Sequence, residues 1–122
     1  MMRQIMWLIL LCAAFPVWSA FVNPSVFDGS AQMNQELNQY IHKNTVARYC
    51  HSSDTQLHCN HEEMKRYEFL ERQAFNKAIH LHNQKIMNQA IFDVCHRSNR
   101  QCSYQNIIVR YYQIKQDSAK FY

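Results

Sequence analysis

The sequence predicts an all-α fold: a small four-helix domain of two disulfide-stapled helical hairpins, preceded by an extended N-terminal segment. First, apolar residues recur every three or four positions over most of the chain after residue 30, which is the spacing of one helix face. Second, no glycine or proline follows Gly29, so no strong helix breaker interrupts that region. Third, four cysteines lie at the ends of the expected helices: Cys50, Cys59, Cys95 and Cys102.

Residues 1–19 have the pattern of a cleavable secretory signal peptide. Arg3 provides a positive charge, and an apolar run over residues 5–15 follows it. Such a run has the length of a signal-peptide core, whereas a helix that spans roughly 30 Å of hydrocarbon needs about 20 apolar residues. We expect cleavage after Ser19, and an uncleaved apolar anchor is the alternative. The mature chain is then a single domain over residues 20–122, secreted or periplasmic, with no membrane attachment.

The cysteine content agrees with export. Cys12 leaves with the signal peptide, so the mature chain keeps an even set of cysteines, which in a short exported chain predicts disulfides. Local pairing, Cys50 with Cys59 and Cys95 with Cys102, closes each helix–helix connection where the two backbones are nearest. The crossed pairing requires the two connections to lie side by side. A thiolate zinc site is a further alternative, although the spacing matches no common zinc module.

Residues 20–30 are expected to be extended, because they contain Pro24 and Gly29 and show no helical period. Their apolar side chains are expected to cover an apolar surface: Phe21, Val22, Val26 and Phe27. The first helix follows over residues 30–50 and ends at the polar residues 51–55, which favour a turn. Its predicted buried face consists of Met33, Leu37, Tyr40, Ile41 and Ala47. The scarcity of glycine argues against tight β-hairpin turns, most of which need positive φ.

The second helix is expected to begin after Asn60. Asparagine caps the free amides of a first helical turn, and Glu63 is placed to complete a capping box. The predicted buried face of this helix consists of Met64, Tyr67, Leu70, Ala74, Ala78 and Leu81. A continuous helix from here to Cys95 would be about 35 residues, which is long for a globular domain. We therefore place a break at residues 82–85, where the apolar stripe falters.

The third helix is expected over residues 86–95, and the fourth begins at Tyr104 after a turn at residues 98–101. Their predicted buried faces consist of Ile86, Met87, Ala90, Ile91, Val94 and Cys95 in the third helix and of Tyr104, Ile107, Ile108, Tyr111 and Ile114 in the fourth. Residues 115–122 are expected to fray.

The charge of the mature chain argues against two classes of partner. The full chain has 13 Lys and Arg and 9 Asp and Glu, so the loss of Arg3 leaves 12 against 9 and a net charge of +3. These charges form no run of one sign. Neither a nucleic-acid-binding arm nor a membrane-surface patch is therefore predicted.

Histidine is the candidate metal ligand of this sequence. Four histidines fall at or beside the expected hairpin bases: His51, His58, His61 and His96. Neutral imidazoles that converge bind zinc or copper. An exported zinc- or copper-binding protein is therefore the alternative function, provided that the two hairpin bases lie together. No other cofactor is predicted.

The predicted function is a non-enzymatic protein-interaction module of the periplasm or cell surface, of the inhibitor, immunity or secretion-accessory type. We expect two of the aromatic residues that lie off the buried faces to pack under the N-terminal segment, and the others to suit a protein partner. These residues are Phe69, Phe75, Phe92 and Tyr112. No catalytic residue is predicted. A small secreted hydrolase that uses His61, His96 and Lys65 for acid–base chemistry is the second alternative.

Overall fold

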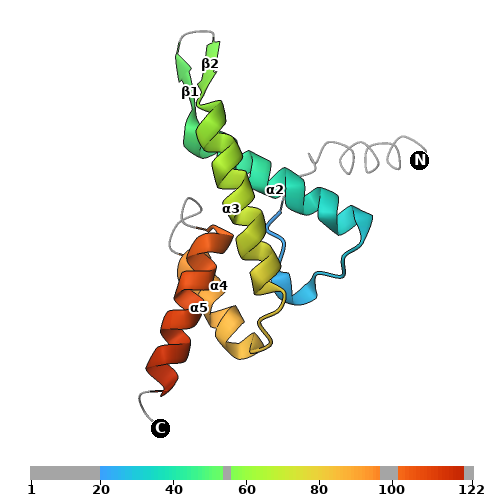
Figure 1. The fold of residues 1–122 in the computed structure, drawn as a ribbon, viewed down its shortest axis with the longest axis vertical. Coiled ribbons are helices and arrows are strands. Elements are labelled where there is room, and N and C mark those ends of the chain that lie inside the picture. Colours follow the sequence, from blue (N-terminus) through green and yellow to red (C-terminus); the bar gives the residue numbers. More distant parts are fainter. Residues whose placement is uncertain (1–19, 54–55, 97–101, 120–122) are drawn as a thin grey trace, which may run out of the picture.

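The computed structural model describes residues 20–53, 56–96 and 102–119. The predicted signal peptide and the predicted turn at residues 98–101 lie outside the described residues. The described chain is all-α apart from one two-stranded sheet, which confirms the predicted fold class (Figure 1). Its elements in chain order are η1 (Pro24–Val26), α2 (Ala31–Tyr49), β1 (Cys50–Ser53), β2 (Gln56–Cys59), α3 (His61–Ala78), α4 (Gln84–Cys95) and α5 (Tyr104–Ala119).

Both local disulfides are present. Cys50 is bonded to Cys59, and Cys95 is bonded to Cys102, which confirms the local pairing and excludes the thiolate zinc site. Disulfides form and persist in oxidising surroundings, so the two bridges indicate an oxidising, extracellular type of compartment. Among the described helices, none combines the length and the apolar character that crossing a bilayer requires.

The connection between α2 and α3 is a β-hairpin, so the prediction of a simple polar turn over residues 51–55 was wrong. β1 and β2 pair antiparallel with Cys50 opposite Cys59, and Figure 1 shows the hairpin projecting from one end of the helices. The pairing extends into the helix ends, because the Asn60 amide donates a hydrogen bond to the Tyr49 carbonyl at 3.0 Å. The disulfide joins the strands at the open end of the hairpin and holds their register without help from glycine.

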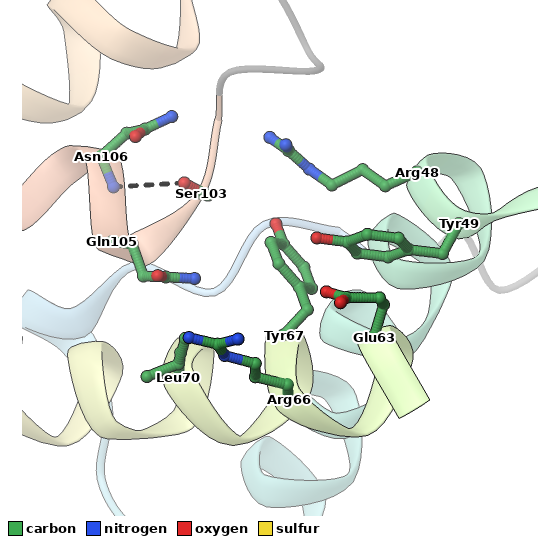
Figure 2. A pocket seen from close by; sticks show the side chains of 9 residues that line it. All are labelled: Arg48, Tyr49, Glu63, Arg66, Tyr67, Leu70, Ser103, Gln105 and Asn106. Carbon is green, nitrogen blue, oxygen red and sulfur yellow. Dashed lines mark hydrogen bonds between the residues drawn. The ribbon is translucent and has the colours of Figure 1, made fainter. Parts of the chain in front are cut away.

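Asn60 caps α3 as predicted, since its Oδ1 accepts a hydrogen bond from the Glu63 amide at 3.3 Å. The return half of the capping box is replaced, because the Asn60 amide donates to the carbonyl of Tyr49 instead. The Glu63 carboxylate is therefore available on the surface between α2 and α3 (Figure 2).

Two helix boundaries differ from the prediction. The break between α3 and α4 covers residues 79–83 rather than 82–85. Asn83 decides its position, because its Oδ1 accepts a hydrogen bond from the Ile86 amide at 3.1 Å and caps α4. At the other end of the domain α5 stays helical to Ala119, beyond the residue at which fraying was expected.

The N-terminal segment covers the core, with one exception. Val22 and Pro24 are buried, and Phe27 packs edge-on against Phe75 with their ring centroids 4.9 Å apart. Val26 is exposed, contrary to the prediction, because the short turn of η1 directs it outward. The buried core cluster consists of Val22, Leu37, Tyr40, Ile41, Phe75, Ala78, Met87, Ala90, Tyr104, Ile107, Ile108 and Tyr111.

The aromatic residues off the predicted faces divide into two pairs. Phe75 is buried under the N-terminal segment, and Tyr112 packs against the core from a half-buried position. Phe69 and Phe92 are exposed.

On α2 the prediction for Ala47 was wrong: this residue is exposed, and Thr45 is buried instead. The threonine tolerates burial because its Oγ1 donates a hydrogen bond to the Ile41 carbonyl at 2.6 Å.

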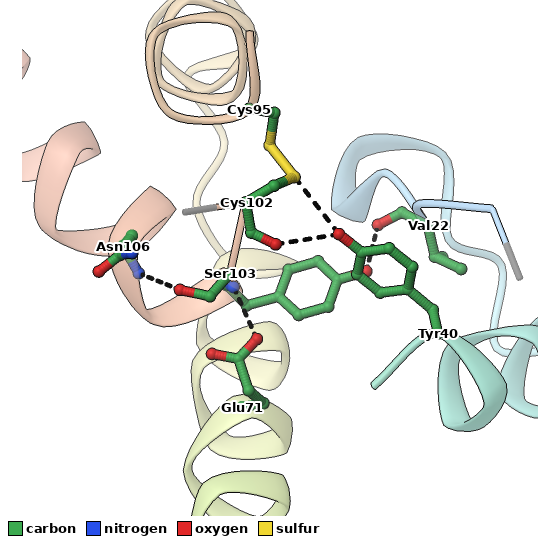
Figure 3. The surroundings of a disulfide bond; sticks show 8 residues. Val22, Tyr40, Glu71, Cys95, Cys102, Ser103 and Asn106 are labelled. Carbon is green, nitrogen blue, oxygen red and sulfur yellow. Dashed lines mark hydrogen bonds between the residues drawn. A yellow bond between two sulfur atoms is a disulfide. The ribbon is translucent and has the colours of Figure 1, made fainter. Parts of the chain in front are cut away.

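A buried carboxylate fixes α5 against α3. Glu71 is 1% exposed, and its Oε2 accepts a hydrogen bond from the Tyr104 amide at 2.8 Å. Its Oε1 accepts from the Gln105 amide at 3.1 Å and from Gln105 Nε2 at 2.9 Å. The free amides at a helix N-terminus attract negative charge, so this one side chain both caps α5 and ties it to the middle of α3 (Figure 3).

Candidate functional site

A polar pocket of about 340 Å³ lies where the end of α2, the first half of α3 and the start of α5 meet (Figure 2). Its lining residues are Arg48, Tyr49, Glu63, Arg66, Tyr67, Leu70, Ser103, Gln105 and Asn106. The Cys50–Cys59 bridge follows α2 and precedes α3, so it holds two of the three walls together. The Glu71 carboxylate holds the third wall, because it binds the first amides of α5.

Local sequence spacing places the lining side chains. Residues three or four apart share one face of a helix, so Glu63, Arg66 and Leu70 present one row along α3 toward the pocket. On the opposite wall, Ser103 Oγ accepts a hydrogen bond from the Asn106 amide at 3.1 Å and so caps α5. Both side chains line the pocket.

Tyr67 is buried beside the guanidinium group of Arg48. The residue is 7% exposed, its hydroxyl is buried, and it shares a side-chain hydrogen bond with Arg48. The Arg48 guanidinium lies over its ring, 5.1 Å from the ring centroid.

The surroundings of Tyr67 keep its phenol protonated. Burial raises the pKa of Tyr67 to about 12, and the negative charge of Glu71 acts in the same direction, whereas the positive charge of Arg48 and its side-chain hydrogen bond with Tyr67 oppose both. Burial also raises the pKa values of Tyr40 and Tyr104. At neutral pH the Tyr67 hydroxyl is therefore uncharged.

We expect the protein to lose stability as the pH rises from about 10 to about 12. Tyr40, Tyr67 and Tyr104 have raised pKa values when folded, so the folded state keeps phenol protons that the unfolded state releases near pH 10. The stabilisation is complete below about pH 10 and is lost toward the folded-state pKa. Phenolate absorbance followed together with far-ultraviolet circular dichroism checks this. Ionisation of every tyrosine near pH 10 with the helices intact would contradict it.

The pocket combines positive charge with hydrogen-bond donors. Arg48 and Arg66 contribute two guanidinium groups against the single carboxylate of Glu63, so the lining has a formal net charge of +1. The Gln105 side-chain amide is engaged by Glu71 at 2.9 Å. Arginine presents a planar fork of donors that matches a carboxylate or a phosphate, so this pocket is suited to an anionic group.

The structure brings together two of the four histidines predicted as metal ligands. His51 lies opposite His58 across the β-hairpin, and His61 is the first residue of α3. His96 follows α4 at the other disulfide. The Cys95–Cys102 disulfide leads from α4 to the start of α5, and the start of α5 is hydrogen-bonded to Glu71. Glu71 lies ten residues, or about 15 Å, along α3 from His61.

No cluster of three or more His, Cys, Asp or Glu side chains able to hold a metal exists among the described residues. Metal binding by the whole set of four histidines stays a prediction. Of the residues named for the hydrolase alternative, His61 and Lys65 are exposed one helical turn apart at the start of α3, whereas His96 is exposed at the end of α4.

Sequence reasoning missed the arginines of the pocket, although a pattern in the sequence could have indicated them. Arg48-Tyr49 and Arg66-Tyr67 are two of the three Arg-Tyr dipeptides in the sequence, the third being Arg110-Tyr111, and these two lie on either side of the Cys50–Cys59 bridge. Once that bridge is assigned, the two helix ends that carry these dipeptides must lie close together.

Comparison with known proteins gives no relative from which a function could be transferred. None of the protein-family models, curated proteins or solved structures with which the chain was compared matches it.

Proposed function

We propose that this protein is a non-enzymatic binding protein of the periplasm or cell surface, and that its pocket holds an acidic group of a protein partner. The observation that carries the proposal is the pair of guanidinium groups, Arg48 and Arg66, that line the pocket beside the buried Tyr67. A carboxylate in the pocket accepts charge-assisted hydrogen bonds from arginine. A volume of about 340 Å³ accommodates an acidic side chain or a chain terminus.

Exposed apolar side chains beside the pocket favour a protein over a small anion. Phe69, 60% exposed, lies one helical turn beyond Arg66 on α3. Val109, 57% exposed, lies one turn beyond Asn106 on α5. Residues one turn apart are neighbours on a helix surface, so both helices offer apolar contact next to the polar pocket. Aromatic residues and arginine are enriched at the centres of protein interfaces.

Two features support export to the periplasm or cell surface. The disulfides suit an oxidising compartment. Residues 1–19 have the charge and apolar pattern of a signal peptide.

Affinity capture from an envelope extract of the native host, followed by titration with the purified partner, tests the proposal. We expect Arg66→Gln to weaken binding by about tenfold or more, because a charge-assisted hydrogen bond contributes about 1.5–3 kcal/mol. Arg72→Gln is the matched control, since it removes the same charge from an exposed position on α3 outside the pocket. Unchanged binding of the Arg66 variant, or equal losses in both variants, would contradict the proposal.

Tyr67→Phe separates binding from folding. The hydroxyl is buried and shares a side-chain hydrogen bond with Arg48, so its removal should lower the free energy of unfolding by no more than about 1 kcal/mol. The same change should weaken partner binding. A variant that lost stability and binding together would assign the hydroxyl a structural role instead.

A further inference from the structure

The β-hairpin places two histidines directly opposite each other. His51 of β1 pairs with His58 of β2 in the antiparallel register, and both residues are exposed. Residues that face each other across an antiparallel pair project from the same face of the sheet, with Cβ atoms about 4.5–5.5 Å apart. The two imidazoles therefore start from neighbouring positions on one solvent-exposed face.

The adjacent disulfide fixes this spacing. Cys50 and Cys59 occupy the next register position, and successive residues of a strand point to opposite faces. The bridge therefore lies on the other face, where it locks the two strands without competing for space with the imidazoles. The hydrogen bond from the Asn60 amide to the Tyr49 carbonyl anchors the hairpin to the ends of α2 and α3. A ligand pair held in this way loses little conformational entropy on binding an ion.

We propose that His51 and His58 together bind a divalent transition-metal ion. Two imidazole nitrogens, each about 2.0–2.1 Å from a tetrahedral ion, lie roughly 3.3 Å apart. Two histidines with the Cβ separation of a cross-strand pair reach that distance. Imidazole suits copper and zinc. Cu²⁺ should bind more tightly than Zn²⁺, because a given nitrogen site generally has a higher affinity for Cu²⁺ than for Zn²⁺.

The site has two protein ligands, which leaves the remaining positions of the ion to water or to a donor from another molecule. No third His, Cys, Asp or Glu joins the pair among the described residues. The inference goes beyond the binding function proposed for the pocket and stands apart from it, because no pocket-lining side chain belongs to the hairpin.

Calorimetric titration of the oxidised protein with ZnCl₂ and with CuCl₂ tests the site. We expect one ion per chain. His51→Ala and His58→Ala should each lower the affinity by about tenfold or more, because either variant keeps only one of the two imidazole ligands. The double variant should be no more than about threefold weaker than either single variant, since the two ligands act as a unit. Circular dichroism and intact Cys50–Cys59 would show that each variant is folded.

His80→Ala/His82→Ala is the matched control. These histidines are two residues apart in the break between α3 and α4, outside the β-hairpin. Their removal should leave the affinity of the hairpin unchanged. A loss of binding in this control, an affinity insensitive to His51→Ala, or no heat of binding with either ion would overturn the proposal.

Discussion

Replacing Cys95 and Cys102 with alanine should lower the free energy of unfolding by about 3–4 kcal/mol. The bridge closes a loop with a sequence separation of 7, and restriction of the unfolded chain by a loop of this length contributes roughly 2.5 kcal/mol. The remainder comes from the burial of Cys102, which is 8% exposed. Loss of the bridge removes sulfur contacts from the interior as well as a constraint on the unfolded state.

The surroundings of this bridge explain why it matters beyond its loop. The Tyr40 hydroxyl donates a hydrogen bond to the Cys102 carbonyl at 2.9 Å and lies 3.3 Å from its Sγ (Figure 3). The residue after next, Tyr104, is fully buried and donates its hydroxyl to the Val22 carbonyl at 2.8 Å. The bridge therefore sits where α2, α5 and the N-terminal segment meet.

Cys50→Ala/Cys59→Ala is the control for this prediction. Its loop is of similar length, with a sequence separation of 9, so the unfolded chain gains similar freedom and the expected loss is about 2.5 kcal/mol. Cys50 and Cys59 are only partly buried, at the base of the projecting hairpin, so little packing is lost in addition. Urea unfolding of both variants measures the difference. An equal loss in the two variants would show that the surroundings of Cys102 contribute nothing.

Glu71→Gln should destabilise the domain by about 2–4 kcal/mol. The carboxylate accepts hydrogen bonds from Tyr104 and Gln105, and hydrogen bonds to charged groups contribute about 1.5–3 kcal/mol. Glutamine keeps the shape of the side chain but turns a donating NH₂ group toward backbone amides that also donate. It also removes the negative charge that the helix N-terminus favours.

Glu68→Gln is the matched variant for Glu71. Glu68 lies one turn earlier on α3 and pairs with His42 at the surface, at 3.0 Å. Exposed ion pairs contribute about 0–1 kcal/mol, so this change should be nearly neutral. Thermal unfolding of both variants distinguishes the two sites. A nearly neutral Glu71→Gln would mean that α5 is held in place by its apolar face alone.

Local patterns determined most of the fold. Apolar spacing predicted four helices, and the positions of the cysteines within that pattern predicted both bridges. The cap at Asn60 was also readable, because capping depends on a few consecutive residues. The corresponding cap at Asn83 was overlooked, and this omission moved the predicted break between α3 and α4.

The pocket depended on contacts that local patterns do not encode. Glu71 falls within the buried face of α3, where its charge marks it as a surface residue until its partners at the start of α5 are known. The juxtaposition of Arg48 with Arg66 likewise requires two helix ends to be joined in space.

By itself, the sequence determined the helices and the paired cysteines, because both depend on short-range spacing. Tertiary structure alone decided which polar groups are buried and which partners they find. The Glu71 carboxylate is satisfied by the amides of another helix, and the Tyr67 hydroxyl is buried beside the guanidinium of Arg48. The physical reason is that hydrogen-bond satisfaction inside a protein depends on atoms more than 30 residues apart in the chain, which meet only after the helices have packed.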